Sequence, residues 1–272
     1  MRRKYSIFVL SVLVFGYAFL YLPIVSLVVF SFNESRLVTV WSRFSTKWYG
    51  ALLSNETILH AAWVSLRVAL MTATGAVILG TLAAVAIVRL RRFKSRSVFN
   101  GLITAPMVMP DVIIGVSLLL LFVGLEQLLG WPQGRGMATI TIAHMTVAVA
   151  YVVVIVRERL LAFDLSLEEA ALDLGARPAE VFLRITLPLI APSLMAGWLL
   201  SFTLSFDDVV IASFMSGPGS TTLPMVVFSS VRLGVSPEIN ALATIIIGFV
   251  TLGVIGAGIF QWRSRRYLKK GN

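Results

Sequence analysis

The sequence predicts an all-α membrane protein that crosses the bilayer six times. Its 272 residues are 58% hydrophobic and only 13% charged. A typical soluble domain carries about 25% charged residues. The apolar residues form six long runs, and most Lys and Arg residues fall between alternate runs. The runs are too long for strands of a membrane barrel, which alternate polar and apolar residues over about ten positions.

The runs themselves set the expected transmembrane helices. The hydrocarbon core is about 30 Å thick, so a spanning helix needs roughly 20 mostly apolar residues. The six runs cover residues 5–32, 68–88, 97–125, 136–156, 185–206 and 239–262. Small residues in the second run predict close packing against a neighbouring helix. They are Gly75, Ala76, Gly80, Ala83 and Ala84.

Basic residues predict the orientation of the chain. They precede the first run, separate the second from the third and the fourth from the fifth, and follow the sixth. The groups are Arg2, Arg3 and Lys4; Arg89, Arg91, Arg92, Lys94 and Arg96; Arg157, Arg159, Arg177 and Arg184; and Arg263, Arg265, Arg266, Lys269 and Lys270. Because Lys and Arg are enriched in cytoplasmic loops, we expect both termini in the cytoplasm.

Composition excludes several classes of function. The absence of cysteine excludes a disulfide scaffold, a thiolate metal site and a cysteine nucleophile. His60 and His144 lie far apart in the sequence, which argues against a histidine-rich metal site. The histidines are single and no intramembrane serine has an evident base, so we expect no catalytic set; we also expect no cofactor. The net charge of +10 is spread over short loops, so we expect membrane lipid and no nucleic acid as a partner.

The longest cytoplasmic connection, residues 157–184, is predicted to form two short helices. Ser166 and Glu169 have the spacing of a capping box, which would begin the first helix. Gly175 suits the left-handed position after a helix, and Pro178 suits the first turn of the next. Pro188 is expected to break or kink that second helix.

Three interpretations of this helix pair are possible: a structured loop, a DNA-binding helix-turn-helix, or a docking element for a cytoplasmic partner. The second helix offers Arg184 against Glu180 and is tethered to spans at both ends, which argues against DNA binding. Small side chains at Ala170, Ala171 and Gly175 would allow a partner to approach closely.

The docking interpretation is supported by a family resemblance. The residues Glu169-Ala170-Ala171, Gly175-Ala176, Phe182 and 185–188 (Ile-Thr-Leu-Pro) resemble the EAA motif of permeases in bacterial ABC importers. Further segments are similar to the spermidine/putrescine subgroup, and most of all to permeases of putrescine importers. These segments are 109–112, 202–208 and 234–244.

The resemblance implies a type I ABC importer permease fold, with residues 1–272 as one transmembrane domain and 157–188 as its cytoplasmic EAA loop. It implies an inner-membrane subunit that is not an enzyme and has no ATPase site. Its partners would be a homologous second permease, two copies of an ATPase and a periplasmic polyamine-binding protein. The substrate would be a polyamine, putrescine rather than spermidine. The ATPase would contact Glu169, Ala170, Ala171, Gly175 and Ala176.

Three acids belong to the apolar runs or their ends: Asp111, Asp207 and Asp208. A charge at the centre of a span costs at least about 2.5–3.5 kcal/mol, so such residues usually face a cavity or a partner. For a dicationic substrate they would replace water lost from each ammonium group. Adjacent helical positions differ by about 100°, so Asp207 and Asp208 are expected to point in different directions.

Aromatic side chains could add cation–π attraction on the substrate path, with Phe202 and Phe206 as candidates. The structural alternative is that Asp207 and Asp208 cap a helix end or pair with Arg67 or Arg232.

A rival function is a secondary transporter or a channel for small organic cations. His144 could then relay protons, although a buried neutral histidine bonded to a neighbouring helix is the expected role. Inverted repeats would favour this rival, and the two halves of the sequence show no convincing repeat.

Overall fold

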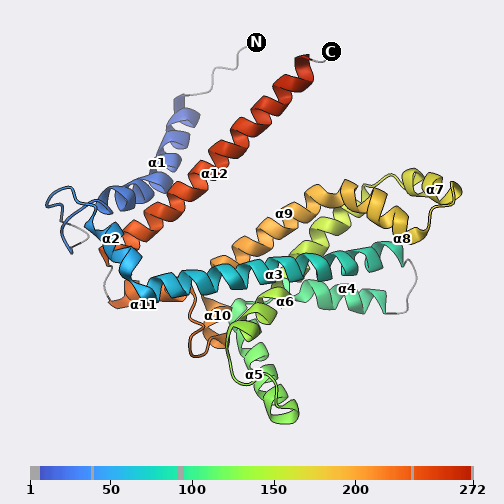
Figure 1. Cartoon of the computed structure of the whole chain (residues 1–272), viewed down its shortest axis with the longest axis horizontal. Coiled ribbons are helices and arrows are strands. Elements are labelled where there is room, and N and C mark those ends of the chain that lie inside the picture. Colours follow the sequence, from blue (N-terminus) through green and yellow to red (C-terminus); the bar gives the residue numbers. More distant parts are fainter. Residues whose placement is uncertain (1–6, 38–39, 91–94, 234–235, 271–272) are drawn as a thin grey trace. The chain divides into compact units, whose positions relative to one another are not determined.

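The computed structural model describes residues 7–37, 40–90, 95–233 and 236–270, and its regular elements there are helices (Figure 1). The chain divides into two compact units: Met1–Leu59 with Ser229–Asn272, and His60–Phe228. Several basic residues of the predicted orientation pattern lie outside the described residues, as do positions 234–235 of the resemblance. These basic residues are Arg2, Arg3, Lys4, Arg91, Arg92 and Lys94.

The first unit contains α1 (Ile7–Phe30), α2 (Lys47–Ser54) and α12 (Pro237–Lys270). Helix α12 packs against both α1 and α2. The loop before α2 is organised by Asn33, which is 1% exposed. Its amide donates to the carbonyl of Val40 at 2.7 Å, and its own carbonyl accepts the indole N–H of Trp48 at 2.7 Å. These bonds satisfy buried polar groups where the chain leaves α1.

The second unit contains the remaining long helices and the short elements between them. In chain order they are α3 (Glu56–Arg89), α4 (Arg96–Thr104), the 3₁₀ turn η1 (Ala105–Met107), α5 (Asp111–Leu129), α6 (Met137–Leu161), α7 (Ser166–Asp173), α8 (Pro178–Val181), the π-helical turn η2 (Phe182–Thr186), α9 (Leu187–Phe206), α10 (Val210–Met215) and α11 (Leu223–Leu233). The first residues of α3 and the last of α11 belong to the other unit.

Helix α6 is the centre of this unit, and its apolar window has the largest buried share of the candidate spans. Val152 on α6 is fully buried. A Cβ on Gly80 of α3 would come within 2.6 Å of Val152 Cγ1, and a Cβ on Gly197 of α9 within 3.5 Å of Val152 Cγ2. The prediction that small residues in the second run pack closely is therefore confirmed at Gly80.

The membrane-spanning pattern largely follows the sequence. Five described helices are long and apolar enough to cross a bilayer: Phe8–Phe30, Glu56–Arg89, Asp111–Leu129, Met137–Leu161 and Pro178–Phe206. The sixth predicted run, 239–262, lies within α12, a single helix. The all-α membrane fold is therefore confirmed.

The third run is the exception, because residues 97–125 do not form one helix. Helix α4 ends at Thr104, η1 follows, and α5 begins at Asp111. Pro106 and Pro110 lack the backbone N–H that a continuous helix would need at their positions. The prediction of one span over 97–125 is wrong, and the helix here that is long and apolar enough to cross a bilayer is Asp111–Leu129.

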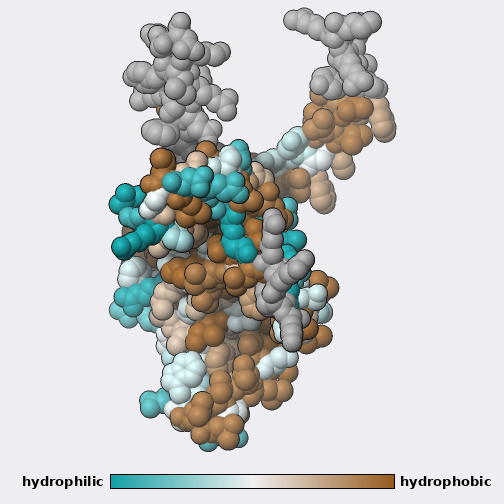
Figure 2. Space-filling view, turned by 90° about the vertical axis from the view of Figure 1, so that its right-hand side faces the viewer, coloured by the Kyte–Doolittle hydropathy of each residue, from teal (hydrophilic) through white to brown (hydrophobic). Residues whose placement is uncertain are grey.

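The surface of the second unit is rich in exposed apolar side chains, many of which can be seen in Figure 2. On α5, Leu128 is 83% exposed and Leu120 is 66% exposed. Clusters of large exposed apolar residues mark surfaces that contact lipid or another protein. This surface accords with a helix bundle in a membrane.

We expect Gly80→Ala to destabilise the protein by about 1–3 kcal/mol, because the new methyl group would overlap Val152 in a packed contact. Alanine is the better helix former, so helix propensity alone would stabilise the variant. A loss of stability would therefore come from the overlap. Thermal unfolding of the purified chain in detergent measures the effect. Gly124→Ala on α5 is the matched control, since no atom lies within 4 Å of its added Cβ. Equal midpoints for Gly80→Ala and wild type would contradict the close contact.

Candidate functional site

A cavity of about 420 Å³ in the second unit brings together the three acids that the sequence singled out. Its lining residues come from the start of α5, the middle of α6, the end of α9 and the segment leading into α10. They are Asp111, His144, Val147, Ala148, Tyr151, Leu204, Ser205, Asp207, Asp208, Val209, Val210 and Ile211. Lysine and arginine are absent from this described lining, so its fixed charges are carboxylates.

Helix ends place the acids in the cavity. Pro110 occupies the position before α5, so Asp111 is the first residue of that helix. Helix α9 ends at Phe206, and Asp207 follows it as the C-cap residue. Both acids lie beyond the last residue of α9, so the helical step assumed for them does not apply. Both line the same cavity.

Asp208 is largely committed to holding α10. One carboxylate oxygen accepts the N–H of Ala212 at 2.9 Å, and the other accepts the N–H of Ile211 at 3.3 Å. Its side chain is 13% exposed. An acid at a helix N-terminus satisfies free N–H groups and complements the helix dipole. The helix-cap alternative therefore describes the contacts of Asp208, whereas Asp207 is an exposed residue.

His144 links α6 to α9 beside these acids. Its Nδ1 lies 2.7 Å from the hydroxyl of Ser205, and its Nε2 lies 3.4 Å from Asp208 Oδ1. The imidazole is 3% exposed. The expected bond from a buried histidine to a neighbouring helix is confirmed. Ser205 and Tyr151 were not predicted as site residues, because a single hydroxyl in an apolar run is equally typical of helix packing.

The aromatic candidates Phe202 and Phe206 lie elsewhere on α9 and are not among the cavity-lining residues. They form a stacked row with Trp198, with ring centroids 5.4 Å and 5.6 Å apart. Residues four positions apart share one face of a helix, which explains the row. The structure groups the acids and leaves the phenylalanines apart from them. Arg67, a suggested partner of the acids, lies over the ring of Trp63 at 4.6 Å.

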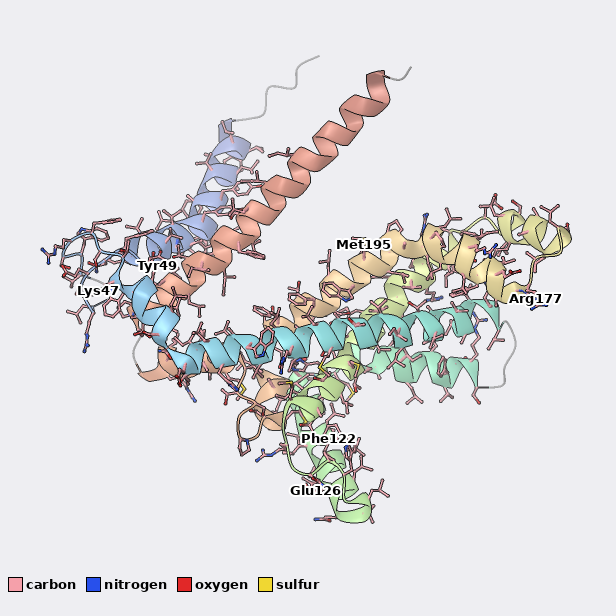
Figure 3. The ribbon with its side chains drawn as sticks, viewed as in Figure 1. Lys47, Tyr49, Phe122, Glu126, Arg177 and Met195 are labelled. Atoms are coloured by element: carbon pink, nitrogen blue, oxygen red, sulfur yellow. The ribbon has the colours of Figure 1, made fainter. Side chains whose placement is uncertain are left out.

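The second candidate site is the connection between α6 and α9, where the predicted helix pair is present as α7 and α8. Gly175 has φ +86°, the left-handed conformation expected after α7. Arg177, labelled in Figure 3, lies directly before α8. Its backbone N–H donates to the Glu180 carboxylate at 3.2 Å. Helix α7 has no buried residue, and Leu174 beyond it is 90% exposed. This surface is available to a partner.

One local prediction for this connection is wrong. Ser166 is the first helical residue rather than the cap, and its N–H donates to Asp164 Oδ1 at 3.0 Å. At Pro188 the structure has an irregularity where one was expected: the π-helical turn η2 ends at Thr186 and α9 begins at Leu187. Pro188 lies in the first turn of α9, where a missing N–H is tolerated.

A carboxylate-lined cavity among long apolar helices is typical of the substrate and ion pathways of membrane proteins. Residues 76–269 match the family model described as "Binding-protein-dependent transport system inner membrane component". The chain belongs to this family of ABC importer permeases.

Named relatives share most of their length with this chain. It is 58% identical to "Putrescine transport system permease protein PotI" of Escherichia coli (strain K12) over 90% of this chain and 86% of that protein. It is 44% identical to "Spermidine/putrescine transport system permease protein PotC" of the same strain, over 94% of this chain and 93% of that protein.

A solved structure shares the fold. The match is a crystal structure of a bacterial ABC transporter that imports the acidic polysaccharide alginate. It has a TM-score of 0.71 at 17% identity, and the alignment covers 96% of this chain and 98% of that one. A second alginate transporter structure, in complex with a periplasmic protein, has a TM-score of 0.69 at 15% identity over 91% of this chain and 90% of that one. The predicted type I importer permease fold is confirmed.

We expect the start of α7 to loosen as the pH falls. Hydrogen bonds from the Ser166 backbone and hydroxyl lower the pKa of Asp164 below its ordinary value. Because its pKa is lower in the folded state, ionised Asp164 stabilises the start of α7 at pH values above its unfolded-state pKa of about 3.9. This stabilisation is lost as the pH falls through the folded-state pKa. Hydrogen exchange of the α7 amides, corrected for intrinsic rates, measures the loss. Asp164→Asn should abolish this pH dependence, and an unchanged profile in that variant would contradict the assignment.

Proposed function

We propose that this chain is the permease subunit of an ATP-driven ABC importer that moves a polyamine, putrescine rather than spermidine, across the bacterial inner membrane. The observation that carries the proposal is the cavity lined by Asp111, Asp207 and Asp208. The similarity to a putrescine permease at 58% identity supports the choice of substrate.

The chemistry of a diamine fits this cavity. Each ammonium group loses hydration inside a membrane protein, and carboxylates replace those lost contacts. A diamine carries its two charges at the ends of a short alkyl chain, so separated acids with apolar surface between them suit it. Asp111 begins α5 and Asp207 follows α9, with Val147 and Ala148 of α6 in the same lining. Because Asp208 caps α10, Asp111 and Asp207 are the acids we expect to contact substrate.

The energy comes from other subunits in this proposal. Helix α7 acts as the coupling helix, with Glu169, Ala170, Ala171, Gly175 and Ala176 at a cytoplasmic ATPase present in two copies. Its exposed surface supports this role. The chain has no ATPase site of its own and performs no covalent chemistry. It switches between inward and outward access when ATP is hydrolysed.

The assembly comprises a homologous second permease and a periplasmic polyamine-binding protein besides the ATPase. The family description, which specifies dependence on a binding protein, supports the latter partner. Both termini lie in the cytoplasm, as the basic residues indicate. Residues 1–272 work as one permease domain, with 157–188 as the EAA loop.

We expect Asp207→Asn to slow putrescine uptake by about tenfold or more, because it removes a charge worth about 1–3 kcal/mol to a partly desolvated ammonium. Asp111→Asn should act similarly. Uptake of labelled putrescine by the reconstituted complex measures the effect, with assembly and basal ATP hydrolysis preserved.

The matched control for these substitutions is Glu126→Gln, an acid outside the cavity whose amide replacement can still accept the N–H of Gly134. Asp208→Asn is the third cavity variant, and it keeps an acceptor for α10. Wild-type uptake in all three single Asp→Asn variants would show that the acids are structural and would contradict the proposed substrate site.

We expect Gly175→Asp to abolish coupled transport while the spans stay inserted. A side chain at φ +86° is strained, and its charge would stand on the proposed ATPase-docking surface. Putrescine uptake and substrate-stimulated ATP hydrolysis should fall together. Gly134→Asp is the control, because Gly134 has φ +83° and lies between α5 and α6. Normal coupled transport by a well-expressed Gly175→Asp complex would contradict the coupling role.

A further inference from the structure

Three segments far apart in the sequence meet at one oxygen atom of Glu168. Its Oε1 accepts a bond from Arg89 Nη2 at 2.6 Å and another from Thr186 Oγ1 at 2.5 Å. Arg89 is the last residue of α3, Glu168 lies in the first turn of α7, and Thr186 ends η2 directly before α9. A single carboxylate therefore ties α7 to two long helices.

The contact is well shielded for a charged cluster. The Glu168 side chain is 17% exposed, the Arg89 side chain 28%, and Thr186 2%. Short bonds between ionised groups are roughly twice as strong as those between neutral groups. Because the pair is partly buried, dissolved salt screens it less than it screens an exposed ion pair. The tie is therefore stronger than the exposed pair of Arg184 and Glu180, whose charged atoms are 4.0 Å apart.

Adjacent glutamates on α7 differ in exposure and in bonding. Glu169 belongs to the EAA motif and is exposed, whereas Glu168 is half-buried. Both line one cavity together with Arg89, and the two short bonds from Arg89 and Thr186 go to Glu168. Helix α7 is therefore anchored through Glu168.

The two helices that Glu168 contacts, α3 through Arg89 and α9 through Thr186, both lead toward the acidic cavity. Helix α9 runs from Leu187 to Phe206, about 30 Å at 1.5 Å per residue, and ends directly before Asp207. Helix α3 leads from Arg89 back to Gly80, which packs on Val152 of α6. Helix α6 also carries His144 in the cavity lining. Regular helices in tight contact shift as rigid elements rather than deform.

We propose that Glu168 is the positioning residue that passes movement of α7 to α3 and α9, and through them to the substrate cavity. The inference rests on the proposed function, because it requires an ATPase that moves α7. Arg89 and Thr186 are the two contacts through which Glu168 acts. Glu169 does not substitute for it, because the two bonds converge on Glu168 alone.

The test uses the complete complex in proteoliposomes, with the binding protein and putrescine as the probe. The measured quantity is putrescine imported per ATP hydrolysed. A variant that only lowers the amount of folded complex reduces the rate of putrescine import and the rate of ATP hydrolysis equally, so this ratio stays unchanged. We expect Glu168→Gln to lower the ratio about fivefold or more, because a neutral amide weakens both bonds. Binding-protein-stimulated ATP hydrolysis should persist.

Further variants separate the two contacts. Arg89→Gln and Thr186→Val should each lower the ratio. Thr186→Ser keeps the hydroxyl group and should therefore have the wild-type ratio. Glu168→Gln combined with Arg89→Gln should be no worse than the more severe single variant, since both break one network. Glu158→Gln is the matched control: its side chain is 67% exposed and its carboxylate lies 4.0 Å from Arg157.

A wild-type ratio in Glu168→Gln would overturn the inference, as would additive losses in the double variant. If Glu168→Gln fails to assemble, the Thr186 pair decides: an unchanged ratio in Thr186→Val, or an equal loss in Thr186→Ser, overturns it. These results leave the proposed function intact when the wild-type complex imports putrescine at the expense of ATP. Absence of that activity in the wild-type complex would instead contradict the proposed function.

Discussion

The packing of α3 and α9 onto α6 at Val152 is the contact on which the second unit depends. Glycines at positions 80 and 197 bring the backbones of both helices close to that side chain. In a bilayer, helices gain little from the hydrophobic effect and associate through close van der Waals contact, which small residues permit. The cavity lies beside this junction, since α6 and α9 both contribute to its lining. A looser junction would separate His144 from Ser205, which are now 2.7 Å apart.

Breaks in the helices supply the polar groups of the cavity. In a continuous helix the backbone N–H and C=O groups bond to one another, so no charged side chain is needed to satisfy them within a membrane. Where α5 begins and α9 ends, free backbone groups and acids occur together. Asp208 bonds the free N–H groups of α10, so its charge has a structural use. Asp111 and Asp207 retain carboxylates for the proposed ammonium ligand.

The connection between α6 and α9 shows how a short helix can serve two surfaces. An eight-residue helix is too short to be stable alone in water. The bonds of Glu168 to Arg89 and Thr186 anchor α7 on one side. Glu169, Ala170 and Leu172 on the same helix are exposed, which leaves them accessible to the proposed ATPase. Anchoring and docking are therefore properties of different residues of the same helix.

The sequence by itself determined the helical class, the apolar spans and the helix pair, because these depend on run length, glycine and proline positions and local charge. It also identified Asp111, Asp207 and Asp208, since acids at apolar runs are conspicuous. The break at 105–110 was partly readable from Pro106 and Pro110, yet the resulting start of the span at Asp111 required the fold. Only the tertiary structure decided that the acids share one cavity, that Phe202 and Phe206 stand apart from it, and that Glu168 contacts Arg89 and Thr186. These relations join residues up to 97 positions apart, such as Asp111 and Asp208, and such proximity depends on how helices pack rather than on local sequence.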